Sequence, residues 1–232
     1  MNTPKTSTSR TLLLLSAPLC LTGLLAGAAA GPATPAAAAA KYIGAARCKG
    51  CHSGAEIGKQ YVIWEKTQHP KAFETLAGDK AKELAKAKGI DDSQKSEACL
   101  KCHVTAFGEP ADNIDKGFKP EMGVQCESCH GPGEAHRKAR MAAAAETDPS
   151  KETPVSPTEI NAKPNIETCH KCHNPESPTY KPFCFKASFA KIVHLRPDKK
   201  RTPEELKKET DPFGCGEAGS CQCPKPVAAA AK

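Results

Sequence analysis

The feature that most constrains this chain is a five-residue pattern, Cys-x-x-Cys-His, which occurs four times in 232 residues. The copies occupy residues 48–52, 99–103, 126–130 and 169–173. Two thiols at this spacing form thioether bonds with the vinyl groups of a porphyrin, and the adjacent histidine supplies a nitrogen ligand to its iron. The pattern therefore predicts four covalently attached haem c groups.

Each residue type in the pattern has a separate predicted role. The attachment thiols are Cys48, Cys51, Cys99, Cys102, Cys126, Cys129, Cys169 and Cys172. The proximal iron ligands are His52, His103, His130 and His173. A disulfide framework or paired zinc knuckles would also use repeated C-x-x-C pairs, because thiolates bind zinc at this spacing. Zinc does not require a histidine directly after every pair, so the repeated pattern favours haem.

The N-terminus has the composition of a secretory signal peptide. Lys5 and Arg10 precede an apolar stretch at 11–30, and an alanine-rich run continues to residue 40. This order of regions is typical of a cleaved signal. The apolar stretch is also just long enough to remain as an anchor helix, but Pro18 and the small residues favour cleavage. We therefore expect residues 1–40 to be removed and the protein to reside in the periplasm, since covalent haem attachment implies export.

The charge balance says little about partners by itself. A formal net charge of +7 would ordinarily suggest an acidic partner or a membrane surface. Haem propionates would offset this charge and would engage some of the basic residues. A nucleic-acid partner therefore has little support.

The sequence predicts a mainly α fold with extensive irregular loops. Aromatic residues make up 5% of the chain, so we expect the porphyrins to supply much of the core of a compact multihaem cytochrome c. Helices are expected at 54–68, at 78–89 and from Pro132, while Thr202 begins a capping box before a charged helix. The predicted organisation is a signal region at 1–40, a tetrahaem domain at 41–200, and a charged helix with a cysteine-rich tail at 201–232.

Four histidines lie outside the repeated pattern: His69, His136, His170 and His194. After cleavage the only methionines are Met122 and Met141. Histidine is therefore the main supply of second axial ligands, and neutral imidazole suits iron. Composition alone leaves each spare histidine as either a distal ligand or a surface or packing residue.

Longer stretches around the motifs carry more information than the motifs alone. They are "CHSGAEIGKQYVIWEKTQHPKAFETL", "CLKCHVTAFG", "GVQCESCHGPG" and "CHKCHN…YKPF". In order and spacing, these stretches resemble successive segments of the cytochrome c-554 family, over residues 46 to about 195. Members are tetrahaem electron carriers that accept electrons from hydroxylamine oxidoreductase. The resemblance implies a donor of that kind, and an acceptor that is a cytochrome or a quinone-linked membrane protein.

The resemblance also implies which histidines share an iron. In the family, three haems have two histidine ligands, and the distal ligand comes from outside the haem's own motif. Carried over to this chain, the distal ligands are His136 opposite His52, His194 opposite His130, and His69 opposite His173. Ligands that cross between motifs would tie the fold together.

In the same family the second haem is five-coordinate, which here leaves the haem on His103 open. Pro182 and Phe183 correspond to residues near that open face, whereas Lys181 stands where the family has threonine. His170 lies inside the fourth motif, and we expect it to face solvent, with ligation of the second haem as the alternative. An open iron could bind and reduce a small nitrogen oxide such as nitric oxide.

Four cysteines of the expected mature chain belong to no haem motif: Cys184, Cys215, Cys221 and Cys223. In an oxidising compartment they most simply form two disulfides, for which three pairings exist. An extra metal site or reactive thiols are the alternatives.

Together these features favour a periplasmic electron carrier over an enzyme. It would pass single electrons between a donor oxidoreductase and a downstream redox partner. Histidine ligation without methionine predicts low to moderate reduction potentials for at least three haems. Two alternatives stay open. One is nitric oxide reduction at the second haem, and the other is a structural subunit that docks into a larger multihaem complex through its tail.

Overall fold

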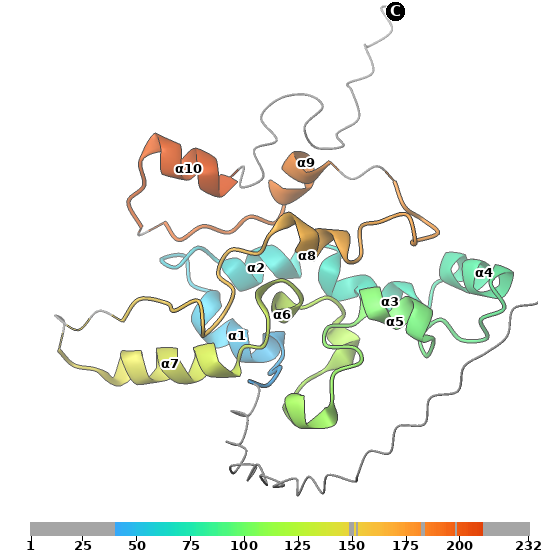
Figure 1. Cartoon of the computed structure of the whole chain (residues 1–232), viewed down its shortest axis with the longest axis horizontal. Helices are drawn as coiled ribbons and strands as arrows, with labels where there is room; N and C mark the ends of the chain where they lie inside the picture. Colours follow the sequence, from blue (N-terminus) through green and yellow to red (C-terminus); the bar gives the residue numbers. More distant parts are fainter. Residues whose placement is uncertain (1–39, 149–150, 152, 182–183, 198, 211–232) are drawn as a thin grey trace, which may run out of the picture. The chain divides into compact units, whose positions relative to one another are not determined.

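A computed structural model describes residues 40–148, 151, 153–181, 184–197 and 199–210 (Figure 1). The chain divides into two units, Met1–Ala37 and Ala38–Lys232, and the described residues all belong to the second. The expected signal region and the cysteine-rich tail from residue 211 lie outside the described residues. No helix within the described ranges is long and apolar enough to cross a membrane.

The described part of the chain consists of short helices joined by irregular segments (Figure 1). The α-helices are α1 (Ala45–His52), α2 (Gln60–Glu65), α3 (Ala72–Thr75), α4 (Asp79–Ala87), α5 (Glu97–His103), α6 (Cys126–His130), α7 (Glu134–Ala145), α8 (Ile166–His170), α9 (Phe185–Phe189) and α10 (Pro203–Thr210). Three short 3-10 helices are His69–Lys71, Ala111–Asn113 and Pro120–Met122. Extended pairing within these ranges is limited to one bridge between Tyr42 and Ile114. The predicted mainly α class is confirmed.

Local sequence explains where several helices begin. Thr202 and Glu205 form the predicted capping box, in which the Glu205 amide donates to the Thr202 hydroxyl at 3.2 Å and the Thr202 amide donates to the Glu205 carboxylate at 2.9 Å. The helix expected at 78–89 runs from Asp79 to Ala87, with Gly78 at its N-cap position. The helix expected from Pro132 begins two residues later, at Glu134.

The helix expected at 54–68 is shorter than its apolar spacing suggested. It covers only Gln60–Glu65, because Gly58 and Lys59 adopt positive φ angles of 105° and 52°. At Gly58 a side chain would collide with the carbonyl oxygen of Leu195. The turn before α2 is therefore fixed by its close approach to a segment more than a hundred residues away.

A buried carboxylate joins the first and third motifs. Glu127, in α6, is 3% exposed and accepts hydrogen bonds from the backbone amides of Ile43 and Gly44 at 2.8 Å each and of Gly133 at 2.7 Å. The neighbouring Gln125 accepts from the Ala45 amide at 2.7 Å. The start of α1, the start of α6 and the segment before α7 are thus held together by side chains that satisfy buried backbone donors.

Candidate functional site

All four motifs lie on helical turns. Helices α1, α5 and α6 each end on the motif histidine, and the fourth motif begins in α8 and ends at His173, whose amide bonds the Cys169 carbonyl at 2.9 Å. Helical geometry places the first cysteine and the histidine four residues later on one face. None of the eight motif cysteines is part of a disulfide, so all eight stay available for thioether attachment.

Thiols from different motifs lie beside one another. The Cys48 and Cys126 side chains share a hydrogen bond. This bond and burial both raise the pKa of Cys48, whereas the same bond lowers the pKa of Cys126 against the effect of burial. Burial and the neighbouring Cys102 raise the pKa of Cys172 to about 12. The first motif therefore neighbours the third, and the second neighbours the fourth.

A third proximity links these two pairs of motifs. Burial, followed by the nearby Cys169, raises the pKa of Cys129 to about 11. The third motif therefore lies near the fourth. The order of neighbouring attachment sites is first, third, fourth, second, which differs from their order along the chain.

Histidines from distant parts of the sequence face one another in three pairs. The distances between ring centres are 6.1 Å for His52 and His136, 6.3 Å for His69 and His173, and 5.9 Å for His130 and His194. These are the pairs that the family resemblance implied. The rings are tilted by 33° to 62° rather than stacked.

The spacing of these pairs fits one metal ion between two imidazoles. Two metal–nitrogen bonds of about 2 Å each, with the short distance from each nitrogen to its ring centre, add to roughly the separations found. Burial is the largest cause that lowers the pKa values of His52, His69, His130 and His173. It therefore favours the neutral ring, which is the form that binds iron. The residues present fit a haem iron in each pair.

Several ring nitrogens that would face away from iron already have partners. The Nδ1 atoms of His103, His130 and His194 lie 2.6, 2.7 and 2.8 Å from the backbone carbonyl oxygens of Ala72, Asn161 and Ile192. The Nδ1 atom of His136 lies 3.3 Å from a carboxylate oxygen of Glu159. Donation from Nδ1 fixes the tautomer and leaves Nε2 for a metal.

The remaining two histidines, His103 and His170, do not join these pairs. Ring contacts in the described part of the chain place His170 against Phe185, with ring centres 4.7 Å apart and an edge-on angle of 76°. Its side chain is 35% exposed, so it is half-buried rather than fully solvent-facing as expected. The motif alone does not predict this contact, because Phe185 lies 15 positions later in the chain.

The segment expected near the open face of His103 is only partly described. Lys181 is exposed, while Pro182 and Phe183 lie outside the described residues. Cys184 is disulfide-bonded, as expected for one of the cysteines that belong to no haem motif. Cys215, Cys221 and Cys223 lie outside the described residues, so the pairing stays a prediction.

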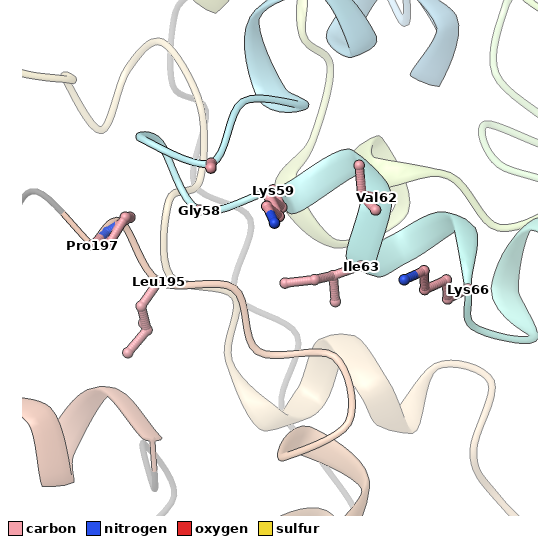
Figure 2. A pocket seen from close by; sticks show the side chains of 8 residues that line it. Gly58, Lys59, Val62, Ile63, Lys66, Leu195 and Pro197 are labelled. Carbon is pink, nitrogen blue, oxygen red and sulfur yellow. The ribbon is translucent and has the colours of Figure 1, made fainter.

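A mainly apolar pocket of about 290 Å³ lies next to one histidine pair. Figure 2 shows its lining residues, which are Ala55, Gly58, Lys59, Val62, Ile63, Lys66, Leu195 and Pro197. Leu195 directly follows His194 in sequence. An apolar wall with two exposed lysines suits a porphyrin, whose body is apolar and whose propionates are anionic. The described residues contain no group of three or more His, Cys, Asp or Glu placed to hold a metal ion.

The roles of two residues near the site could not be predicted from the motifs. Glu127 occupies a variable position of C-x-x-C-H, and Glu159 lies in a proline-rich loop. Acidic residues at such positions are ordinarily solvated. Only the fold reveals that one binds three backbone amides and the other a histidine.

The sequence is also similar to known proteins. A family model described as cytochrome c554 and c-prime matches residues 47–131, which hold the first three motifs. Cytochrome c-554 of Nitrosomonas europaea is 32% identical over 144 residues, covering 58% of this chain. This chain spans 59% of that relative's length. No solved structure matches. Over these residues the chain, with its motifs and its helical fold, is similar to the cytochrome c-554 family.

Proposed function

We propose that this protein is a periplasmic tetrahaem c-type cytochrome that passes single electrons between a donor oxidoreductase and a downstream redox partner. The observation that carries the proposal is the set of three histidine pairs with ring centres 5.9–6.3 Å apart. Each pair joins a motif histidine to one from a distant segment. The family supports the coarser statement, a haem-containing electron carrier.

The chain's own residues would attach, ligate and shield the cofactors. Haem supplies reversible one-electron chemistry when bound, while the protein sets ligation, solvent access and spacing. The cysteine pairs would anchor each porphyrin, and carbonyl acceptors such as that of Ala72 would hold the ligand rings. Two histidines per iron, without methionine, favour low to moderate potentials.

The proximity of the motifs supports a relay rather than four independent centres. Cys48 lies beside Cys126, Cys129 near Cys169, and Cys172 near Cys102. Each attachment site therefore has a neighbour. Haems held at neighbouring sites would lie close to one another, which suits electron transfer between them.

The partners and location follow from resemblance and from the N-terminal sequence. A donor similar to hydroxylamine oxidoreductase, and an acceptor that is a cytochrome or a quinone-linked membrane protein, are proposed by analogy with the family. The basic, apolar and alanine-rich regions of residues 1–40 support export to the periplasm.

A second candidate function rests on His103. In the described part of the chain, each of the other three motif histidines faces a partner histidine. The ring of His103 instead contacts the Ala72 carbonyl. An iron held on His103 alone would have a free position for a small molecule. Reduction of nitric oxide there is the alternative activity.

Electron paramagnetic resonance of the oxidised holoprotein, with haem counted on the same sample, tests both proposals. We expect four haems per chain with about one in four high-spin, as a single five-coordinate centre requires. If all four haems are low-spin, the electron-carrier proposal stands and the nitric oxide site is ruled out. A chain with fewer than four haems would overturn the tetrahaem assignment.

A further inference from the structure

One irregular segment contacts ligand histidines of two different centres. At its end, the Asn161 carbonyl accepts from Nδ1 of His130 at 2.7 Å, and the Asn161 amide donates to the His130 carbonyl at 2.9 Å. Two residues earlier, a carboxylate oxygen of Glu159 lies 3.3 Å from Nδ1 of His136. The segment 156–161 therefore orients a ligand candidate of the first haem and one of the third.

Glu159 is held in place by more than its histidine. Its other carboxylate oxygen accepts from the Arg140 guanidinium at 2.9 Å, and the Ser156 amide donates to the same oxygen at 3.2 Å. His136 and Arg140 are four residues apart in α7, so they share one face of that helix. The carboxylate thus bridges a histidine and an arginine on a single helical surface.

This cluster is largely withdrawn from water. The side chains of His136, Glu159 and Arg140 are 16%, 13% and 24% exposed. A charge in such a position acts on its neighbour more strongly than one at an exposed surface. The guanidinium also donates to the Thr153 carbonyl at 2.6 Å, which further fixes its position.

The acceptor of His136 differs in charge from those of other ligand candidates. His103, His130 and His194 face neutral backbone carbonyls through Nδ1, whereas His136 faces a carboxylate. A carboxylate acceptor makes imidazole a more basic ligand. A more basic ligand stabilises ferric over ferrous iron, and hydrogen bonding to an axial ligand is one of the means by which a protein sets a haem potential.

We propose that Glu159 is a positioning residue that orients the ring of His136 and lowers the reduction potential of the haem attached to Cys48 and Cys51. Arg140 opposes this effect because its positive charge neutralises part of the carboxylate. The inference rests on the proposed function, since it requires His52 and His136 to share a haem iron.

The test is Glu159→Gln in the full-length holoprotein. Glutamine keeps the size and an acceptor oxygen but removes the charge. We expect one potential of the four to rise, by about 59 mV if the preference of the ligand set for ferric iron falls about tenfold. Spectroelectrochemical titration measures the potentials, and paramagnetic NMR of haem methyl groups identifies the haem attached through Cys48 and Cys51. Glu83→Gln, which changes an exposed carboxylate of α4 paired with Lys80, is the matched control.

Arg140→Gln separates charge from positioning. Removing the guanidinium exposes His136 to the full carboxylate charge, so the same potential should fall instead of rising. Potentials that rise in both variants would overturn the charge effect, because loosening of the segment alone would explain them. If the Glu159→Gln protein does not bind haem, the direction in which the reduction potential shifts in Arg140→Gln tests the proposal instead.

Failure of the inference is distinct from failure of the proposed function. A haem-loaded Glu159→Gln protein with four unchanged potentials would overturn the role of Glu159 alone. A wild-type chain without haem, or a His136→Ala variant with no more high-spin haem than wild type, would overturn the ligation on which the inference rests.

Discussion

The ring of His69, the first residue of the 3-10 helix His69–Lys71, faces the ring of His173, 104 residues later in the chain, with 6.3 Å between their centres. The backbone of His69 is fixed as well, because its carbonyl accepts from the Val124 amide at 3.0 Å. This pair therefore joins three segments that are far apart in sequence. The proposed fourth haem site would depend on all of them.

Replacement of His69 by alanine should convert the haem on His173 from low-spin to high-spin. The backbone contact with Val124 does not need the side chain, so the fold should persist with an empty axial position. Electron paramagnetic resonance should show about one additional high-spin haem per chain, and added imidazole should reverse the change. His170→Ala is the control, since His170 packs against Phe185. An unchanged spin state in the His69→Ala variant would contradict the assignment of His69.

Glu127→Gln should destabilise the protein by about 1–3 kcal/mol, the usual cost of leaving a buried donor unsatisfied. The glutamine amino group would face a backbone N–H where the carboxylate oxygen now accepts from Gly44. Urea unfolding of the holoprotein, followed by far-ultraviolet circular dichroism, gives the change in free energy. Glu83→Gln, at an exposed position, should stay within about 0.5 kcal/mol of wild type. A loss confined to the control would refute the role of Glu127.

The same carboxyl group predicts a pH dependence. Burial raises the pKa of Glu127, and the three backbone amides only partly oppose it. The folded state therefore binds this proton more tightly than the unfolded state. The contribution of the group to stability is full below the ordinary carboxyl pKa and is lost as pH rises through the raised pKa. Subtracting the Glu127→Gln unfolding curves from wild type, measured from acid to neutral pH, should isolate this slope; a slope of opposite sign would contradict it.

Gly58→Ala should cost more than Gly89→Ala, although both glycines have positive φ angles of 105° and 68°. A side chain at Gly58 would collide with the Leu195 carbonyl, whereas nothing lies near the corresponding position at Gly89. We expect about 1 kcal/mol at Gly89 from the backbone alone and more than about 2 kcal/mol at Gly58, where contact adds to it. Because Leu195 follows His194, the Gly58 variant should also perturb the haem on His130. Equal thermal stabilities would show that the contact is unimportant.

The sequence predicted the parts of the site that depend on local spacing. Cys48, a predicted attachment thiol, and His52, the predicted iron ligand of the same motif, lie within five positions, so the chemistry itself sets the pattern. The capping box at Thr202 was predictable for the same reason. The pairing of distant histidines came from family resemblance, because one sequence contains no distance between His69 and His173.

What the sequence could not predict depends on tertiary contacts. The sequence at 54–68 places apolar residues at helical spacing and predicts one helix. The contact of Gly58 with Leu195 prevents helical structure before Gln60. Glu127 and Glu159 look like ordinary surface charges. Their roles arise only when the fold brings backbone amides to one and His136 to the other.

A chain matured without haem should lose most of its cooperative structure. The buried apolar residues in the described part are Ile43, Ala45, Tyr61, Leu76, Ala85 and Phe185. The large ones contribute about 1.5–3 kcal/mol each, whereas ordering the backbone costs about 1–2 kcal/mol per residue. Porphyrin faces must therefore supply much of the missing burial. Protein produced in the cytoplasm without haem attachment should show weak helical circular dichroism and rapid amide exchange. The Cys99→Ala, Cys102→Ala double variant, which should lose only the second haem, should fall between that protein and wild type. A haem-free chain with a sharp unfolding transition would demonstrate that these side chains suffice.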